Sequence, residues 1–458
     1  MQSKSQAPSI TTGPITAQLL LFFFPILLGT FFQQLYNTVD TIIVGNFVGT
    51  NTALAAVGGA TGQLVNLFVG FFIGLSSGCG VIISQYYGAK DHRAVSKSVH
   101  TALAFSLLSG VVIMVLGLAL TNVSLRAMSL PEEIMPEASA YLRIFFLGMI
   151  PNLFYNMGAA VLRAIGDSKR PLYFLILSCL CNIVLDLIFV AYLRLGVSGA
   201  ALATILSQLA SAVMVLFVLL RTKSDVRLIP SQLRLETFWL KKMIYVGLPA
   251  GLQSTMYTVS NIIVQATINS FGTNTIAAVT AYGKMDVIFW MVINAFGIAI
   301  TTFVGQNYGA GKTDRAFRGF RAALLLSAIG TLLLSGIIWL FGMNFLRFFT
   351  KDPDVLAICN RLIHFVVPFF ITYIPIEICS GTLRGMGNSW MPMILTMLGV
   401  CVLRMFWIFL AVPRHRDILT LMTAYPISWI TTSVALSLSL FLTRRRYLSQ
   451  RSESEKSS

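Results

Sequence analysis

Long runs of apolar residues, separated by short polar segments, follow one another along the chain from Ile15 to Val434. Apolar stretches of 18 or more residues are long enough to cross a bilayer as helices. With breaks at charges, Gly and Pro, the pattern predicts an all-α polytopic membrane protein with twelve transmembrane helices. These begin near Ile15, Leu54, Ala94, Glu137, Pro171, Val197, Leu240, Ile276, Ala316, Ile358, Met391 and Ile418.

The composition agrees with a membrane protein, since 56% of the residues are hydrophobic and only 11% are charged, against about 25% charged in soluble proteins. A net charge of +16 could indicate nucleic acid, but the basic residues form short clusters between apolar runs, as the positive-inside rule predicts. We therefore expect the lipid bilayer as a partner, and no nucleic acid. The six cysteines lie in apolar segments without C-x-x-C spacing or a nearby histidine cluster, so we expect small core residues and not metal ligands. No cofactor is expected.

The basic residues also predict the orientation, because cytoplasmic loops carry most Lys and Arg. Only six of the 33 lie in the loops of the opposite side, namely Arg126, Arg194, Arg347, Lys351, Arg414 and Arg416. We therefore expect both termini to be cytoplasmic, in the cell (inner or cytoplasmic) membrane. The predicted order is a cytoplasmic segment 1–14, an N-lobe 15–221, a cytoplasmic linker 222–239, a C-lobe 240–443 and a disordered cytoplasmic tail 444–458.

Two motifs occur twice in the sequence, at an offset of 221 residues: Gln85–Ala89 matches Gln306–Ala310, and Leu162–Ser168 matches Leu383–Ser389. The halves are therefore tandem copies. Each copy holds an even number of spans, so both enter the membrane from the same side, which predicts two six-helix bundles related by a pseudo-two-fold along the membrane normal. Such repeats are typical of alternating access, and a purely structural duplication is the alternative.

These residues resemble the multidrug and toxic compound extrusion (MATE) transporters over nearly the whole chain. The resemblance rests on Pro25, the segment Gln33–Asp40 with Gly45, both duplicated motifs, and Asn182-x-x-x-Asp186. It implies that Asp40, Asn182, Asp186 and Thr204 form the amino-lobe cation site of the DinF-like branch. The seventh helix, about Leu240 to Ser270, has no acid, which is unlike the NorM-like branch and favours the DinF-like one.

Four of the seventeen acidic residues fall within predicted spans: Asp40, Asp186, Asp286 and Glu377. A central aspartate costs about 2.5 to 3.5 kcal/mol on insertion scales, so such residues usually line cavities or carry ions.

Tyr36 and Asp40 are four residues apart, as are Asn182 and Asp186, so each pair lies on one helix face. Two carboxylates in a poorly hydrated lobe require a proton or a cation. We predict a coupling site for Na⁺ or H⁺ at these four residues and Thr204. For Na⁺, the ligands are expected from Asp40, Asn182, Asp186 and Thr204. A hydrogen-bonded clamp between helices one and five is the alternative.

The C-lobe does not repeat this site, because the positions matching Asp40 and Asp186 fall near Ile263 and Trp407. A second set of charges, Lys284, Asp286, Glu377 and Arg404, is expected there instead. Pairing of Glu377 with Arg404 or of Asp286 with Lys284 is one interpretation, and substrate contact or gating is the other.

Two prolines, Pro25 and Pro249, lie early in equivalent helices one and seven. Proline removes a backbone donor and weakens the helix locally, so both are hinge candidates, with static kinks as the alternative.

The repeats, the buried acids and the resemblance predict a secondary active multidrug exporter that is not an enzyme. It is expected to function as a monomer and to exchange Na⁺ or H⁺ for amphipathic, often cationic, organic compounds. The chain has no G-x-x-x-x-G-K-[ST] element for a nucleotide motor.

The alternative is a lipid-linked oligosaccharide flippase of the same superfamily, although its anionic headgroup should require basic residues in the amino lobe. A membrane-embedded enzyme is less favoured, because H-E-x-x-H and paired Asp-x-x-Asp motifs are missing.

Overall fold

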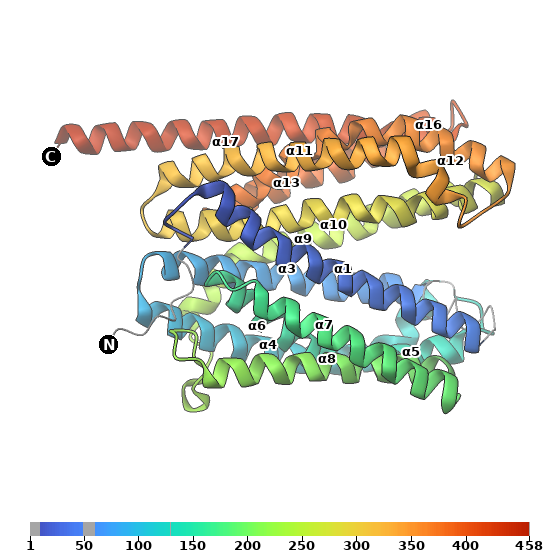
Figure 1. Cartoon of the computed structure of the whole chain (residues 1–458), viewed down its shortest axis with the longest axis horizontal. Helices are drawn as coiled ribbons and strands as arrows, with labels where there is room; N and C mark the ends of the chain where they lie inside the picture. The colour runs from blue at the N-terminus through green and yellow to red at the C-terminus, as the bar shows by residue number, and fades with distance from the viewer. Residues whose placement is uncertain (1–9, 49–59, 129, 458) are drawn as a thin grey trace. The chain divides into compact units, whose positions relative to one another are not determined.

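The computed structural model describes residues 10–48, 60–128 and 130–457, and every regular element among them is a helix (Figure 1). The first half contains α1 (Ile15–Phe47), α3 (Ala60–Gly88), α4 (His92–Ala127), α5 (Met135–Leu147), α6 (Met149–Ala164), α7 (Lys169–Asp186), a π-helical turn η1 (Leu187–Tyr192) and α8 (Gly196–Arg221). A 3₁₀ turn η2 (Pro230–Gln232) follows in the linker.

The second half contains α9 (Thr237–Asn269), α10 (Thr273–Gly309), α11 (Thr313–Leu346), α12 (Pro353–Val366), a 3₁₀ turn η3 (Val367–Phe369), α13 (Phe370–Gly385), α14 (Trp390–Thr396), a π-helical turn η4 (Met397–Val402), α15 (Leu403–Ala411), α16 (Ile418–Met422) and α17 (Ala424–Ser457).

Among the described residues, ten helices are long and apolar enough to cross a membrane, and the bent pair α5 and α6 makes an eleventh span. The helix α9, 33 residues long, brings the number of membrane-length segments to twelve, six in each half. This confirms the predicted all-α membrane protein. The predicted start of the second helix near Leu54 lies outside the described residues.

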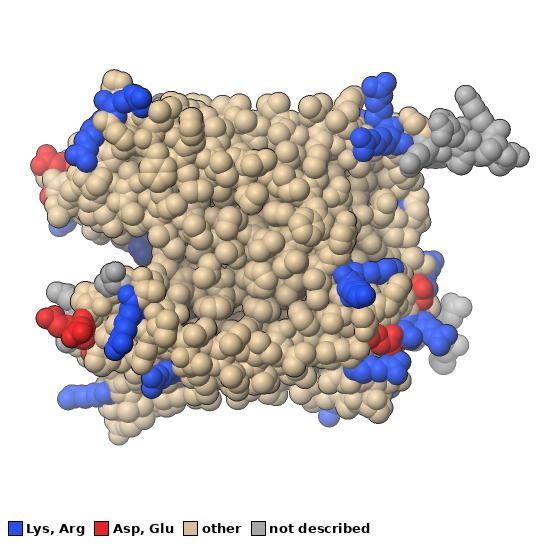
Figure 2. Space-filling model, turned by 180° about the vertical axis from the view of Figure 1, so that it is seen from behind, with Lys and Arg blue, Asp and Glu red and all other residues tan. Residues whose placement is uncertain are grey.

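The surface between the helix ends carries few charges. On the face shown in Figure 2, charged side chains gather near the ends of the helices and uncharged residues cover the region between. Large apolar side chains are exposed, for example Leu21 on α1, Leu333 on α11 and Phe409 on α15. A surface with few charges and many exposed apolar side chains suits contact with lipid chains.

Contacts divide the chain into two units. Unit 1 consists of Leu20–Gly251 with the short segments 10–13 and Gly305–Gly311, and unit 2 of Leu252–Val304 and Lys312–Ser458 with Pro14–Leu19. Unit 1 therefore extends beyond the linker predicted at 222–239.

The linker is docked onto α4 within unit 1. Val226 and Leu228 are buried, and the Ile229 amide donates to His100 Nε2 at 2.9 Å. Glu236 forms ion pairs with Arg234 and Lys97, and the Arg234 guanidinium holds the pKa of the Glu236 carboxyl below its usual range. The linker is therefore ordered and packs against α4.

The tail was predicted to be disordered after Arg444, and this prediction is wrong, because α17 continues to Ser457. Extending an existing helix avoids the cost of nucleation, and Arg, Glu and Lys are good helix formers.

The duplicated Leu-Arg-x-x-Gly motifs end α6 and α13. Gly166 and Gly387 have φ angles of 93° and 92°, a left-handed conformation that glycine adopts without steric cost. The amides of Asp167 and Asn388 donate back to Leu162 and Leu383 at 3.0 and 2.9 Å. This is the Schellman pattern, so both copies of the motif act as helix stops.

The two Gln-x-Tyr-Gly-Ala motifs approach each other within unit 1. A Cβ atom placed on Gly88 would overlap the carbonyl of Gln306, and one placed on Gly309 would overlap the carbonyl of Gln85. Each glycine thus allows close contact with the backbone of the other copy, and a side chain at either position would separate them.

Candidate functional site

The two acids of the N-lobe lie together in unit 1. Asp40 is on α1 and Asp186 is the last residue of α7, and both are buried. They interact electrostatically with each other, and Tyr36 interacts with Asp40. Tyr141 of α5 interacts with all three. The structure therefore brings Tyr36, Asp40 and Asp186 together, as the sequence predicted, and adds Tyr141, which no local pattern distinguished from an ordinary buried tyrosine.

One core cluster positions these side chains. It contains Val44 of α1, Leu142 of α5, Val190 of η1 and Ala200 of α8. Asp40 is four residues before Val44, Tyr141 is next to Leu142, and Asp186 is four residues before Val190. The apolar contacts that pack these four segments therefore also fix the helical turns that carry Asp40, Tyr141 and Asp186.

Thr204 is placed by the pairing of α7 with α8. Ser178 Oγ donates to the Ser207 carbonyl at 3.0 Å, and Ser211 Oγ donates to the Phe174 carbonyl at 3.4 Å. In this antiparallel register Thr204 lies at the level of Asn182, one turn further along each helix. Its hydroxyl donates to the Ala200 carbonyl at 3.0 Å, which leaves the oxygen lone pairs available as acceptors.

Most polar atoms of this cluster have no hydrogen-bond partner. Both side-chain atoms of Asn182, both oxygens of Asp186 and Oδ1 of Asp40 are buried and unsatisfied. Each such group costs about 1 to 3 kcal/mol, so buried polar groups are normally paired. The predicted clamp is therefore not formed by the described side chains of Asn182 and Asp186. The cluster is instead a set of oxygen acceptors that a cation or protons would satisfy.

The composition of the cluster limits which ions fit it. Among the described residues there is no group of three or more His, Cys, Asp or Glu side chains suited to a metal. Two carboxylates, an amide oxygen and a hydroxyl would supply a shell of oxygen donors with at most two negative charges. Such a shell suits a monovalent cation such as Na⁺ better than a transition metal, and the carboxylates alone can take up protons.

The helix changes form directly after the site. Asp186 ends α7, and η1 continues as a π-helical turn in which Leu193 N–H donates to the Ile188 carbonyl at 2.8 Å. A π-turn contains one more residue per hydrogen-bonded ring than an α-helical turn. It therefore changes the direction in which the following side chains point. Single π-turns of this kind occur frequently at functional sites.

The charges of unit 2 are not paired as one interpretation predicted. In the part of the chain that the structure describes, no salt bridge joins Asp286 to Lys284 or Glu377 to Arg404. Lys284 is exposed. It does not meet Asp286, because residues two apart on a helix face different directions. Asp286 instead accepts a hydrogen bond from Trp290 Nε1 at 2.7 Å.

Glu377 and Arg404 each have other neighbours in unit 2. Glu377 lies against Gly297, where an added Cβ would overlap its carboxyl group, and it interacts electrostatically with Tyr257. The Arg404 guanidinium lies 4.2 Å from the centre of the Tyr425 ring, and its Nε is buried without a hydrogen-bond partner.

An aromatic cluster connects these groups. The ring centres of Trp290 and Tyr373 are 4.8 Å apart, those of Tyr373 and Trp429 are 5.6 Å apart, and those of Tyr425 and Trp429 are 5.5 Å apart. Aromatic faces next to carboxylates attract organic cations. Sequence patterns did not single out these rings, because the segments that carry them are far apart in the chain.

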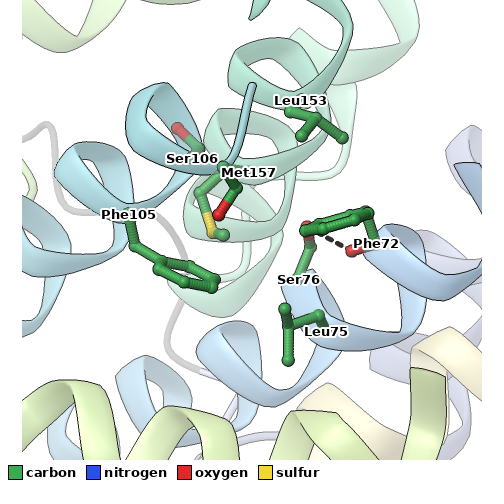
Figure 3. Close-up of a pocket in the computed structure, with 8 residues that line it drawn as sticks. Phe72, Leu75, Ser76, Phe105, Ser106, Leu153 and Met157 are labelled. Carbon is green, nitrogen blue, oxygen red and sulfur yellow. Dashed lines mark hydrogen bonds between the residues drawn. The ribbon is translucent and has the colours of Figure 1, made fainter. Parts of the chain in front are cut away.

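A small pocket lies in unit 1 between α3, α4 and α6 (Figure 3). It is lined by Phe72, Leu75, Ser76, Phe105, Ser106, Ser109, Leu153 and Met157. The hydroxyls of Ser76 and Ser106 donate to carbonyls of their own helices at 2.8 Å. None of the predicted coupling residues lines this pocket, so it is separate from the acidic cluster.

A family model described as MatE matches residues 25–188 and 249–410. The family unit therefore occurs twice along the chain, which agrees with the duplication inferred from the repeated motifs.

Known proteins resemble the chain along most of its length. It is 30% identical to the "Probable multidrug resistance protein YpnP" of Bacillus subtilis, over 87% of this chain and 89% of the relative. It is 25% identical to the "Probable multidrug resistance protein NorM" of Thermotoga maritima, over 88% and 87%. A crystal structure of MATE in complex with MaD3S superposes with a TM-score of 0.88 at 23% identity, covering 99% of this chain and all (100%) of that chain.

Proposed function

Because this chain belongs to the MatE family of transporters, we propose that it exports amphipathic, often cationic, organic compounds in exchange for Na⁺ or H⁺. Family members are transporters and not enzymes. The exchange is proposed to follow alternating access in a monomer of the cell membrane, with both termini in the cytoplasm. The assignment to the DinF-like branch, from the N-lobe acids and the absence of an acid in α9, is part of the same proposal.

The observation that carries the coupling proposal is the set of unsatisfied oxygens at Asp40, Asn182 and Asp186. Protons or a sodium ion entering the cluster would satisfy these atoms and reduce the repulsion between the carboxylates. Tyr36 and Tyr141 border the acids and limit access of water. Since both acids are fixed to separate helices, ion binding favours α1 and α7 close together, and ion release favours their separation.

The energy available to such a site is sufficient for export without a nucleotide motor. One net charge moved down 100 mV yields about 2.3 kcal/mol, which corresponds to roughly a fifty-fold concentration ratio when the exported compound is neutral or when two ions are exchanged for one monovalent cation. In a one-for-one exchange of cations, a tenfold ion gradient supports about a tenfold ratio.

The substrate side of the proposal rests on unit 2. The aromatic cluster of Trp290, Tyr373, Tyr425 and Trp429 is bordered by two carboxyl groups, Asp286 and Glu377. One guanidinium, that of Arg404, lies on the Tyr425 ring, so the two carboxylates leave the cluster with an excess of negative charge. Rings and an excess of carboxylates favour an organic cation over an anion. The acidic cluster of unit 1 likewise argues against an anionic pyrophosphate headgroup, and thus against a lipid-linked oligosaccharide as cargo.

The proposal is tested with inverted membrane vesicles that contain the protein. Uptake of a fluorescent organic cation is measured under an imposed Na⁺ gradient and, separately, under an imposed pH gradient. We expect uptake with one of the two gradients and none in vesicles that lack the protein. Uptake that is equal with and without any gradient would show passive transport and contradict the proposal.

We expect Glu377→Gln to change the substrate range more than the ion coupling. Loss of the charge should reduce transport of cations relative to neutral compounds by about tenfold, a difference of about 1.4 kcal/mol. Gly297→Ala, which displaces the same carboxyl group, should act in the same direction. Gly330→Ala is the control, since its nearest neighbour is Phe296 at 4.0 Å. Loss of the ion response with every substrate would instead place Glu377 in the coupling step.

Pro25 lies within α1, fifteen residues before Asp40, and Pro249 lies within α9. Pro25→Ala restores a backbone donor and stiffens α1. If α1 bends during transport, we expect slower efflux with unchanged equilibrium binding of a cationic ligand, because the moving element is altered and the binding surface is not. Unchanged efflux, or binding lost together with efflux, would identify Pro25 as a static kink.

A further inference from the structure

Six arginines gather where the charged ends of α11 and α17 meet in unit 2. Arg315, Arg318 and Arg321 lie in the first turns of α11, and Arg444, Arg445 and Arg446 follow the apolar part of α17. The Arg444 guanidinium lies 5.7 Å from the centre of the Phe317 ring of α11, so the two ends are neighbours. Figure 1 shows the start of α11 and the C-terminal end of α17 on the same side.

Two of the six arginines have structural contacts. Arg444 stacks on Phe317, and Arg315 donates to Gln18 Oε1 at 3.2 Å. The other four, Arg318, Arg321, Arg445 and Arg446, are exposed, and none of them belongs to an ion pair among the described residues.

The local charge is almost entirely positive. Among the described side chains of α11 and α17, Asp314 is the single acidic residue. Four exposed guanidinium groups are therefore available to an anion from outside the chain.

Exposed apolar side chains lie next to these arginines on both helices. On α11, Leu325 and Leu332 are exposed, and on α17, Leu438 and Phe441 are exposed. Arg321 precedes Leu325 by four residues and Arg445 follows Phe441 by four, which is about 6 Å along a helix in each case. In each case the arginine therefore lies about one helical turn beyond the exposed apolar side chains.

We infer that this arginine cluster binds the phosphate of an anionic phospholipid in the cytoplasmic leaflet, whose acyl chains lie along the exposed apolar faces of α11 and α17. The guanidinium fork matches phosphate oxygens in a bidentate manner. Clusters of four or more basic residues just outside a membrane helix favour anionic lipids. The inference rests on the proposed orientation of the chain and is independent of the coupling site.

Native mass spectrometry of the purified full-length protein tests this site. The protein is titrated with dioleoyl phosphatidylglycerol and, separately, with dioleoyl phosphatidylcholine. We expect the wild type to retain phosphatidylglycerol at an about tenfold lower concentration than phosphatidylcholine. The variant Arg318→Gln/Arg321→Gln/Arg445→Gln should lose this preference. The matched variant Arg318→Lys/Arg321→Lys/Arg445→Lys keeps the charge but not the fork and should retain a weaker preference.

A control variant removes the same number of charges elsewhere. Lys223, Arg227 and Lys241 are exposed basic residues of unit 1, and their replacement by Gln should leave the preference unchanged. Equal loss in this control would show an effect of net charge alone and overturn the inference. It would also be overturned if the arginine-to-glutamine variant kept the wild-type preference, or if inorganic phosphate displaced phosphatidylglycerol at equal concentration, since the site would then bind a soluble anion.

Discussion

Asp186→Asn should abolish ion-driven export while the protein remains folded. The amide keeps the shape of the side chain, but it can neither release a proton nor supply the charge that a sodium ion requires. Without coupling, the accumulation of an organic cation under a tenfold ion gradient, which is about tenfold for one-for-one exchange, should fall to none. Accumulation in inverted vesicles measures this directly, with the folded fraction checked by size-exclusion chromatography.

Asp40→Asn should have the same effect, and the double variant should be little worse than either single one, because residues that act as one site are not additive. Asp354→Asn is the control, since Asp354 is an exposed aspartate in the first turn of α12. Near-normal accumulation in Asp186→Asn would contradict the coupling site, and defects that multiply in the double variant would indicate two separate sites.

Gly88→Ala should strongly reduce the stability of the folded protein. The added methyl group would overlap the backbone carbonyl of Gln306, and a backbone cannot give way as a flexible side chain can. Overpacking of this kind costs about 1 to 3 kcal/mol or more. Gly309→Ala should behave similarly, because its methyl group would meet the Gln85 carbonyl. Thermal unfolding of the detergent-solubilised protein, followed by loss of the monodisperse peak, measures the effect.

The matched control is Gly336→Ala on α11, where nothing lies within 4 Å of an added Cβ. Alanine is the better helix former by about 0.5 to 1 kcal/mol, so this variant should be as stable as the wild type or more stable. If Gly88→Ala and Gly336→Ala unfold at the same temperature, the close approach of the two motifs does not contribute to stability.

The sequence alone was sufficient for features that depend on local order. Hydropathy predicted the membrane helices, because crossing a bilayer requires an unbroken apolar run that is visible in the chain itself. The repeated motifs predicted the duplication, and spacing of four residues predicted that Tyr36 and Asp40 share a helix face, as do Asn182 and Asp186. The structure places Tyr36, Asp40 and Asp186 in one cluster.

Other features were decided by contacts between distant segments. Tyr141 joins the acids because the packing of Leu142 and Val44 brings α5 to α1. Asp286 accepts a hydrogen bond from Trp290, four residues away, which lies on the same helix face. It does not pair with Lys284, which is two residues away and lies on another face. Gly88 and Gly309 have no visible role until the other copy of the Gln-x-Tyr-Gly-Ala motif is beside them. Periodicity specifies which face a residue occupies, whereas its neighbours across that face are fixed only when the helices pack.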